Sequence, residues 1–336
     1  MPGAASGGSC ASTQRAAQRQ ARVRAYAKLN LGLRVLYKRP DGYHELRTIF
    51  QTISLADSLE ISCGRASSTL IEMEGAPEIP DNLAERAARL VLEAAGKHAH
   101  VRIKLRKNIP TGAGLGGGSS DAAAVLLALP VLAGIRLPVE QLTALAARLG
   151  SDVPFFLYGG TALGLGRGEE LYPLPDQPTE RVLLIAPAVH SSTADAYRDL
   201  SSTLPAGSLT NIALQNKLDS FQRLAWEDNK SSIINDFESV VMARHPELAE
   251  IPGKLRRAGA TRVAMTGSGS AIFGVFDNPG KLERARLGWE KRAASGERAF
   301  SVSFVSRSQY QSAWRRSLED DKKGDETWPP QSRHAR

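Results

Sequence analysis

The stretch Gly112-Ala-Gly-Leu-Gly-Gly-Gly-Ser-Ser120 is the strongest local signal in the sequence, and the fold is worked out from it. Apart from Leu115 it holds only glycine, alanine and serine, so a ligand can approach its backbone closely. A helix is expected to begin at Ser119, directly behind the loop. The N–H groups of the loop and the positive end of the helix dipole then point to one place, which predicts a site for a polyphosphate. A flexible surface turn is the simpler alternative, but it does not account for the helix start beside the loop.

Two better-known phosphate loops do not fit the surroundings of this stretch. Gly112, Gly114 and Gly117 satisfy G-x-G-x-x-G, but a dinucleotide site needs a following strand with an acidic residue about 20 positions on. Residues 119–129 and 138–149 are expected to be helices instead. A Walker A loop needs Gly-Lys-Ser/Thr and a protein kinase needs H-R-D, and the sequence contains neither. The loop therefore belongs to another class of phosphate site.

The overall composition is that of a globular chain whose positive charge lies mainly at its ends. The chain has 336 residues, 42% hydrophobic and 23% charged, which suits two domains. The net charge of +8 suggests nucleic acid, yet residues 25–306 hold 32 basic and 30 acidic side chains. Two cysteines exclude a disulfide framework and favour a reducing, cytoplasmic location. The longest apolar run, residues 122–135, is too short to span a membrane.

The periodicity around the loop predicts segregated strands and helices. Residues 25–33 alternate as a strand that places Lys28 and Asn30 on one face, and a helix is expected over 82–95. After a Gly/Pro-rich stretch at 159–178, a strand is expected over 182–186. The order from residue 236 to 305 is then helix, strand, strand, helix, strand. Hairpin connections of this kind favour an α+β fold over a doubly wound one.

Three segments, taken in order, resemble the motifs of the GHMP kinase superfamily. They are Ala27-Lys-Leu-Asn-Leu31, Ile109-Pro-Thr-Gly-Ala-Gly-Leu-Gly-Gly-Gly-Ser-Ser-Asp-Ala122 and Met265-Thr-Gly-Ser-Gly-Ser270. Four more segments resemble members that act on a cytidine-diphosphate-linked alcohol: Asp41-Gly-Tyr-His44, Asp81-Asn-Leu83, Gly150-Ser-Asp-Val-Pro-Phe155 and Asn235-Asp-Phe-Glu238. The resemblance covers about residues 24–306, nearly the whole chain outside its tails.

The resemblance implies a small-molecule kinase with two domains. The expected reaction is ATP- and Mg²⁺-dependent phosphorylation of the 2-hydroxyl of cytidine-diphosphate-linked methylerythritol, a step of the non-mevalonate route to isoprenoids. A kinase of the same superfamily for another small alcohol, of the homoserine or mevalonate type, is the alternative. The N-terminal domain would resemble domain 2 of ribosomal protein S5, and the other would be ferredoxin-like. The expected parts are a disordered extension at 1–23, an ATP-binding domain at 24–175, a substrate domain at 176–310 and a charged tail at 311–336.

The resemblance also assigns individual residues. Lys28 matches the catalytic lysine, which would favour the charged form of Asp152 and neutralise charge on the transferring phosphoryl group. Asp152 matches the base, although on local sequence alone it serves equally well as the N-cap of a short helix. ATP is expected at Asn82, Lys107, Pro110, Thr111, Gly112, Ala113, Gly114, Leu115, Gly116, Gly117, Gly118, Ser119 and Ser120. The Mg²⁺ ligands are not identified, although Ser119 or Ser120 could supply a hydroxyl.

The substrate is expected to meet a separate set of side chains. His44 would read the edge of the cytosine, and Tyr43 and Tyr197 would stack on the base. Asn30 and Thr193 would hydrogen-bond to hydroxyl groups of the substrate. Nucleic-acid binding is the competing function class, but aromatics make up only 6% of the chain and no basic stripe with interleaved aromatics is evident. The chain is therefore expected to bind no nucleic acid and no membrane, and to be a monomer or a homodimer.

Overall fold

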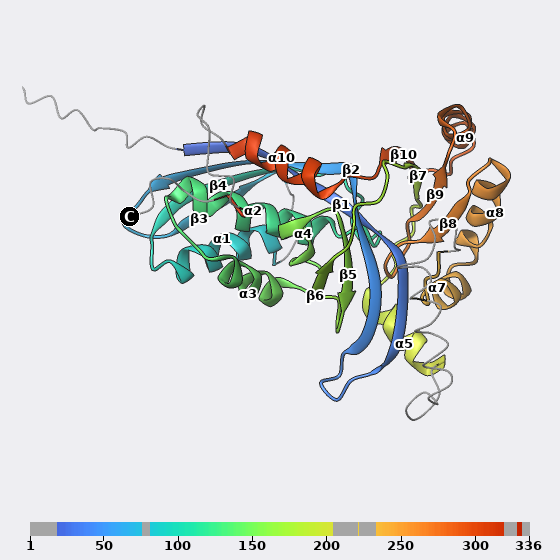
Figure 1. The fold of residues 1–336 in the computed structure, drawn as a ribbon, viewed down its shortest axis with the longest axis horizontal. Coiled ribbons are helices and arrows are strands. Elements are labelled where there is room, and N and C mark those ends of the chain that lie inside the picture. The colour runs from blue at the N-terminus through green and yellow to red at the C-terminus, as the bar shows by residue number, and fades with distance from the viewer. Residues whose placement is uncertain (1–18, 76–80, 204–220, 222–232, 319–327, 331–336) are drawn as a thin grey trace, which may run out of the picture.

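The computed structural model describes residues 19–75, 81–203, 221, 233–318 and 328–330. The elements form two sheets that lie side by side, each with helices against it (Figure 1). The first is six-stranded, with the order β3-β4-β2-β5-β6 and β1 paired to β2. The second is four-stranded, with the order β10-β7-β9-β8. The two sheets correspond to the two expected domains.

The first domain covers its sheet with helices on one face. Its strands are β1 (Arg19–Lys38), β2 (His44–Arg65), β3 (Leu70–Glu74), β4 (Ala99–Arg106), β5 (Thr161–Leu165) and β6 (Glu170–Pro173). Its helices are α1 (Leu83–Ala94), α2 (Gly117–Ala133), α3 (Val139–Leu149) and α4 (Phe155–Tyr158). Helix α2 is buried on nearly every side, because its residues 122–129 are all alanine, valine or leucine. It therefore fixes the glycine loop before it to the domain core.

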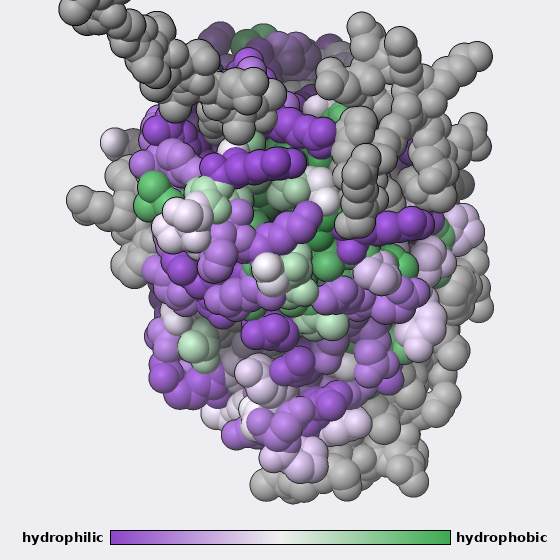
Figure 2. All heavy atoms as spheres, turned by 90° about the vertical axis from the view of Figure 1, so that its left-hand side faces the viewer, coloured by the Kyte–Doolittle hydropathy of each residue, from purple (hydrophilic) through white to green (hydrophobic). Residues whose placement is uncertain are grey.

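Apolar side chains of the first domain are turned inward. Figure 2 shows the end of this domain that lies at the left of Figure 1, and the visible surface is mostly hydrophilic with small apolar patches. The helices α1, α2 and α3 share one buried cluster with the sheet, which includes Val91, Leu105 and Leu145. Among the described residues, no helix has both the length and the hydrophobicity that crossing a bilayer requires.

The hairpin formed by β1 and β2 links the two domains. Its strands are antiparallel and, at 20 and 22 residues, extend well beyond the first sheet (Figure 1). Leu33 of β1 forms a parallel bridge with Asn235, and Ile53 of β2 an antiparallel bridge with Phe304. Residues such as Leu29 and Ile53 accordingly belong to a core cluster shared with Phe273 of the second sheet. One continuous hairpin therefore carries side chains to the junction between the domains.

The second domain has the expected ferredoxin-like order. Its strands are β7 (Arg181–Ala186), β8 (Arg262–Met265), β9 (Ile272–Phe276) and β10 (Arg298–Ser303), and its helices are α5 (Thr193–Thr203), α7 (Glu238–Arg244), α8 (Glu250–Arg257) and α9 (Pro279–Glu290), with the 3₁₀ turn η2 (Pro246–Leu248). Adjacent strands are antiparallel throughout. The predicted α+β class and two-domain architecture are confirmed.

Both ends of the described chain depart from the expected boundaries. Residues 19–23 lie in β1, where Arg19 pairs with Cys63, so they are not part of a disordered extension. At the other end, α10 (Arg307–Leu318) returns to the first domain and buries Tyr310 and Trp314. The indole Nε1 of Trp328 donates to the carbonyl of Leu157 at 2.9 Å. Residues 311–318 and 328 therefore belong to the core of the first domain, because buried aromatics outweigh the charged side chains around them.

Candidate active site

A cleft of about 510 Å³ lies between the two domains and collects most of the expected site residues. Its lining includes Lys28, Asn30, Asn82, Lys107, every residue from Pro110 to Ser119, Asp152, Thr193 and Tyr197. Gly267 and Ser268 of the third motif close it from the second domain. Tyr43, His44 and Ser120 do not line it. The three motifs are thus brought together from positions more than 230 residues apart in the chain.

The glycine loop is shaped for an anion. Gly112, Gly114 and Gly116 have φ angles of 69°, 75° and 70°, which side chains rarely allow. A Cβ on Gly114 would lie 2.2 Å from the carbonyl oxygen of Thr266, so the third motif packs directly on the loop. Gly116 is the N-cap of α2 and provides no side chain to satisfy the first N–H groups of the helix. Gly117, Gly118 and Ser119 line the cleft at this helix start, so their N–H groups can bind phosphate oxygens.

Lys28 and Asp152 form an ion pair in the cleft. The Nζ of Lys28 lies 3.5 Å from Oδ2 of Asp152, and the lysine side chain is only 4% exposed. Asp152 is 35% exposed and thus open to a ligand. The N-cap of α4 is Pro154, and no side chain caps that helix. Asp152 is therefore not the N-cap of a short helix, the alternative that its local sequence allowed. The carboxylate is available for chemistry rather than for capping.

A polar network under Lys28 holds its ammonium group in place. Lys28 Nζ donates to Oδ1 of Asn30 at 2.6 Å, and Nδ2 of Asn30 donates to Oγ1 of Thr48 at 2.6 Å. The hydroxyl of Thr266 accepts from the backbone N–H of Asn30 at 3.0 Å. All four residues are at most 3% exposed. Sequence reasoning missed Thr48, since a lone threonine in a strand carries no signal of its own.

Lys107 is held between two buried carboxylates. Its Nζ lies 2.5 Å from Oδ2 of Asp57 and 2.7 Å from Oδ2 of Asp121. Asp57 also accepts from the backbone N–H groups of Asn108 and Ile109. Burial raises the pKa of Asp121 to about 7. The positive charge of Lys107 lowers this pKa in part, whereas the negative charge of Asp57 raises it further. Oδ1 of Asp121 is buried without a hydrogen-bond partner, and Asp121 lines the cleft.

His44 and Tyr197 form the aromatic end of the site. Their rings stack with centroids 4.9 Å apart, and Tyr197 packs edge-on against Phe237 at 4.8 Å. Nε2 of His44 lies 2.7 Å from the hydroxyl of Ser201. Burial, with a smaller effect from Lys38, lowers the pKa of His44 and favours its neutral ring. Burial likewise raises the pKa of Tyr197, so its hydroxyl stays protonated.

Tyr43 lies outside this aromatic pair. It is 54% exposed, and the guanidinium of Arg167, which lines the cleft, stacks 4.6 Å from its ring centroid. The structure therefore places Tyr197 against His44 rather than opposite Tyr43. Arg167 gave no signal in the sequence, because it lies within the Gly/Pro-rich stretch 159–178 and belongs to no recognisable motif.

Small hydroxyl residues of the second domain close the cleft. Thr193 Oγ1 lies 2.8 Å from the hydroxyl of Ser268, and Ser191 donates to the carbonyl of Ser268 at 2.7 Å. His190, also missed from sequence, lies so close to Gly112 that a Cβ there would be 2.3 Å from its Nδ1. The segment 190–193 therefore touches both the glycine loop and the third motif.

The possible Mg²⁺ ligands are few. Within the described ranges, no cluster of three or more His, Cys, Asp or Glu side chains could hold a metal. Ser120 is 2% exposed and donates to the carbonyl of Tyr26 at 2.7 Å, so it is turned away from the cleft. Of the two expected serines, Ser119 remains at the lining. This donor set suits a cation held largely by nucleotide phosphates.

Comparison with known proteins identifies both halves of the chain. Residues 82–160 match the GHMP kinases N terminal domain, and residues 211–295 match the GHMP kinases C terminal domain. The 4-diphosphocytidyl-2-C-methyl-D-erythritol kinase of Solibacter usitatus is 52% identical over 94% of this chain and 98% of its own. That of Geobacter sp. (strain M21) is 40% identical over 80% and 93%.

Solved structures agree with these sequence relatives. A crystal structure of 4-(cytidine 5'-diphospho)-2C-methyl-D-erythritol kinase is similar with a TM-score of 0.70 and 39% identity, and covers 85% of this chain and 99% of its own. The homoserine kinase of Cytophaga hutchinsonii, with 20% identity and a TM-score of 0.64 over 88% and 96% of the two chains, shares the fold.

Proposed function

The chain belongs to the GHMP kinases, in the group of 4-diphosphocytidyl-2-C-methyl-D-erythritol kinases, and from this membership we propose how its cleft works. It is a small-molecule kinase that uses ATP to phosphorylate the 2-hydroxyl of its cytidyl-diphosphate substrate, a step in the non-mevalonate route to isoprenoids. Kinases of the homoserine and mevalonate type are 20% and 13% identical and share the fold alone.

The observation that carries the mechanism is the ion pair of Lys28 and Asp152 beside the glycine loop. The carboxylate of Asp152 accepts the proton of the substrate hydroxyl. The hydroxyl oxygen forms a bond to the γ-phosphorus, and the bond from that phosphorus to the bridging oxygen breaks, so that ADP leaves with the electron pair. Lys28 offsets the negative charge of the transferring group. Phosphoryl transfer asks mainly for such positioning and electrostatic stabilisation.

The nucleotide phosphates bind at the start of α2 under this proposal. The unsatisfied N–H groups after Gly116 and the backbone of residues 110–119 supply hydrogen bonds to the phosphate oxygens. Asn82 and Lys107 line the adenosine side, where Lys107 is fixed by its two carboxylates. The Ser119 hydroxyl would help to hold a Mg²⁺ ion that arrives with the nucleotide, and the ion would neutralise phosphate charge.

The cytidyl end of the substrate binds at the aromatic end of the cleft. Tyr197 offers a ring for stacking. His44 offers Nδ1 to the cytosine edge, because its Nε2 already lies 2.7 Å from the hydroxyl of Ser201. Tyr43 would move to the other side of the base once it is bound. Asn30 and Thr193 would bind hydroxyl groups on the way to the reacting centre. Residues 24–175 are assigned to ATP and 176–310 to the substrate, with the β1–β2 hairpin shared between them.

A coupled assay for ADP release tests the catalytic assignment. Asp152→Asn should retain nucleotide binding and lose about 10²–10⁴-fold in kcat, the usual contribution of a general base. Asp81→Asn is the matched control, since Asp81 also lines the cleft but pairs with Arg86 and has a φ of 56° that asparagine tolerates. Unchanged turnover in Asp152→Asn would refute the role of the base.

A panel of alcohols tests the substrate assignment. ATP should be consumed with the cytidyl-diphosphate alcohol and not with homoserine or mevalonate. His44→Ala should raise KM for the cytidyl substrate by about tenfold or more, since one lost hydrogen bond in a specific site costs roughly that factor. His98→Ala, on the surface beside Thr69, should leave KM unchanged. Equal turnover of a small alcohol without the cytidyl group would contradict the assignment.

The cellular setting follows from the same features. We propose a cytoplasmic enzyme, supported by its two cysteines and by the kinase reaction, which needs ATP. We also propose a monomer or homodimer that binds no nucleic acid. A titration with single-stranded and duplex DNA should show no binding even at low salt, where electrostatic binding to nucleic acid is strongest.

A further inference from the structure

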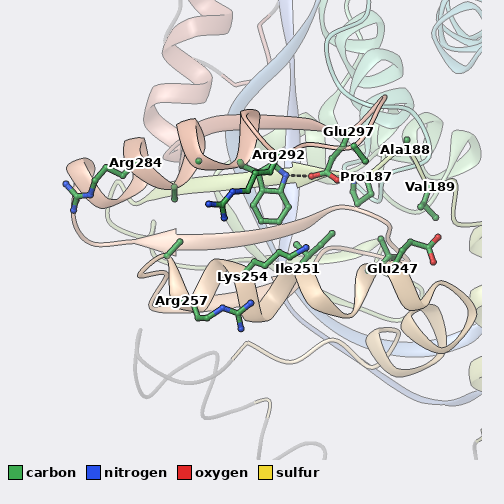
Figure 3. Close-up of a pocket in the computed structure, with 16 residues that line it drawn as sticks. Pro187, Ala188, Val189, Glu247, Ile251, Lys254, Arg257, Arg284, Arg292 and Glu297 are labelled. Atoms are coloured by element: carbon green, nitrogen blue, oxygen red, sulfur yellow. Dashed lines mark hydrogen bonds between the residues drawn. The ribbon is translucent and has the colours of Figure 1, made fainter.

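A second cavity, about 810 Å³ in volume, lies on the far side of the second domain, between α8 and α9 (Figure 3). Helix α8 packs over β8 and β9, whereas α9 packs mainly over β7 and β10, and the groove opens between the two helices. Its apolar floor includes Val189, Leu248, Ile251, Ala285 and Trp289. No residue lines both this groove and the catalytic cleft.

Four cations stand around this apolar floor. Lys254 and Arg257 come from α8, Arg284 comes from α9, and Arg292 follows the end of α9. The three arginines form no ion pair within 4.0 Å among the described residues, whereas Arg286 of α9 pairs with Glu283 and Glu290. An arginine beside an apolar cavity whose guanidinium is in contact with no carboxylate retains its capacity for a bidentate contact to an anion.

The charges are arranged along the groove with a direction. Figure 3 shows Arg257 and Arg284 at one end and Glu247 and Glu297 at the other. Glu297 accepts a hydrogen bond from the indole Nε1 of Trp289, as the dashed line in Figure 3 marks, and so is already engaged. An anionic group is favoured at the arginine end, and an apolar body can then extend over Ile251 and Trp289.

We propose that this groove binds a small anionic amphiphile, with one phosphate or carboxylate group and an apolar chain or ring. The volume lies within the roughly 300–1,000 Å³ of small-molecule pockets, which are mostly apolar with a few placed polar groups. Burial of the apolar part supplies most of the affinity, and the arginines select the acid over neutral molecules. The proposal is independent of the kinase reaction, because the groove and the cleft share no lining residue.

Calorimetric titration of the full-length protein with octyl phosphate, below its micelle concentration, tests the proposal. One molecule should bind per chain. Octyl glucoside, with the same chain and no charge, should bind at least about tenfold more weakly, the value of one charge-assisted hydrogen bond. Octyltrimethylammonium and inorganic phosphate should not bind. Octyl carboxylate binding as well as octyl phosphate would show that the acid, and not phosphate itself, is recognised.

Two variants locate the site. A Cβ on Gly288 would meet nothing within 4 Å and Gly288 lines the groove, so Gly288→Leu places a side chain there and favours the helix. It should abolish binding while the melting temperature stays equal or rises. Arg257→Ala should weaken binding about tenfold, as expected for a lost charge-assisted contact. Arg256→Ala is its matched control, because Arg256 is the neighbouring exposed arginine in the last turn of α8 and does not line the groove.

Four results of the binding experiments would overturn the proposal. They are equal binding of octyl glucoside, unchanged binding to Gly288→Leu, equal effects of the two arginine variants, and displacement of octyl phosphate by saturating ATP. The last would place the probe in the catalytic cleft. A dimer in sedimentation that Gly288→Leu dissociates would also overturn it, since a second copy of the chain would then fill the groove.

Discussion

The stability of the first domain should fall as the pH rises from about 4 to about 7, because the carboxyl of Asp121 keeps its proton in the folded chain over this range and loses it in the unfolded chain. The pKa of this buried carboxyl is raised from its ordinary 3.8 to about 7, chiefly by burial. In the unfolded chain it loses its proton near pH 4, whereas in the folded chain it keeps the proton up to about pH 7. The folded state therefore binds more protons throughout this window, and the free energy of unfolding decreases with pH. Asp121→Asn removes this titration and stays neutral.

The size of the effect follows from the two pKa values. At about 1.36 kcal/mol per pH unit, the contribution of Asp121 should decrease by roughly 3 kcal/mol between pH 5 and pH 8. Urea unfolding at constant ionic strength measures it, followed by tryptophan fluorescence because Trp314 and Trp328 lie in the first domain. The difference between Asp121→Asn and wild type should grow by that amount from pH 5 to pH 8, in favour of the variant.

A matched control separates this group from other carboxyls. Glu140 is exposed at the first turn of α3, so Glu140→Gln should keep the wild-type dependence on pH. A difference between Asp121→Asn and wild type that is the same at pH 5 and pH 8 would refute the reasoning. It would mean that Lys107 keeps both carboxylates charged, with no shared proton between them.

Three further changes test how the cleft and the first domain are held together. Gly114→Ala should lower the stability by about 1–3 kcal/mol and weaken ATP binding, since its φ is positive and its Cβ would meet Thr266; Gly96→Ala, with a positive φ and open space, should affect stability alone. Asn235→Ala should cost about 2–3 kcal/mol and raise KM for ATP, because its buried amide donates to the carbonyls of residues 265 and 267; an unchanged KM in steady-state kinetics would contradict this. Trp328→Ala should lower the urea midpoint, by about 1–3 kcal/mol in free energy, with kcat unchanged; full stability would show that the residue is not docked.

The fold was largely predictable because local patterns and motif order both pointed to it. The helix before β4 was expected within one residue at each end, and the order of helices and strands after residue 236 was also expected. The two ends of the ordered core were not predicted correctly, because the tails were assigned from their charge alone. Residues 311–318 contain two arginines, which favour a solvated tail, and Trp314, which favours burial. Only the packing of Trp314 in the core of the first domain shows that burial prevails. Similarly, Arg19 to Val23 carry no signal for a strand until Cys63 and its neighbours on β2 pair with them.

Site residues that lie in a recognisable motif could be predicted from the sequence. Residues that meet only in the folded structure could not. Lys28 and Asp152 were expected to meet, and they do. Asp121 lies inside the quoted second motif, yet only its burial beside Lys107 gives it a distinct role. Asp57 follows an ordinary apolar stretch 50 residues from Lys107, and no spacing rule connects the two. Pairings of this kind depend on the register of β2 against β4.

Backbone hydrogen bonds on both sides of the glycine loop indicate that the cleft is already assembled before a ligand arrives. The backbone N–H of Lys28 donates to the carbonyl of Leu115, and that of Ala271 donates to the carbonyl of Ala113. The glycine loop is thus tied on one side to β1 and on the other to the third motif. Since the loop gains its shape from these bonds, binding of the nucleotide need not order it, and its N–H groups stay directed at the place where phosphate charge develops. The glycines therefore serve the close approach of the two domains as much as the approach of the phosphates.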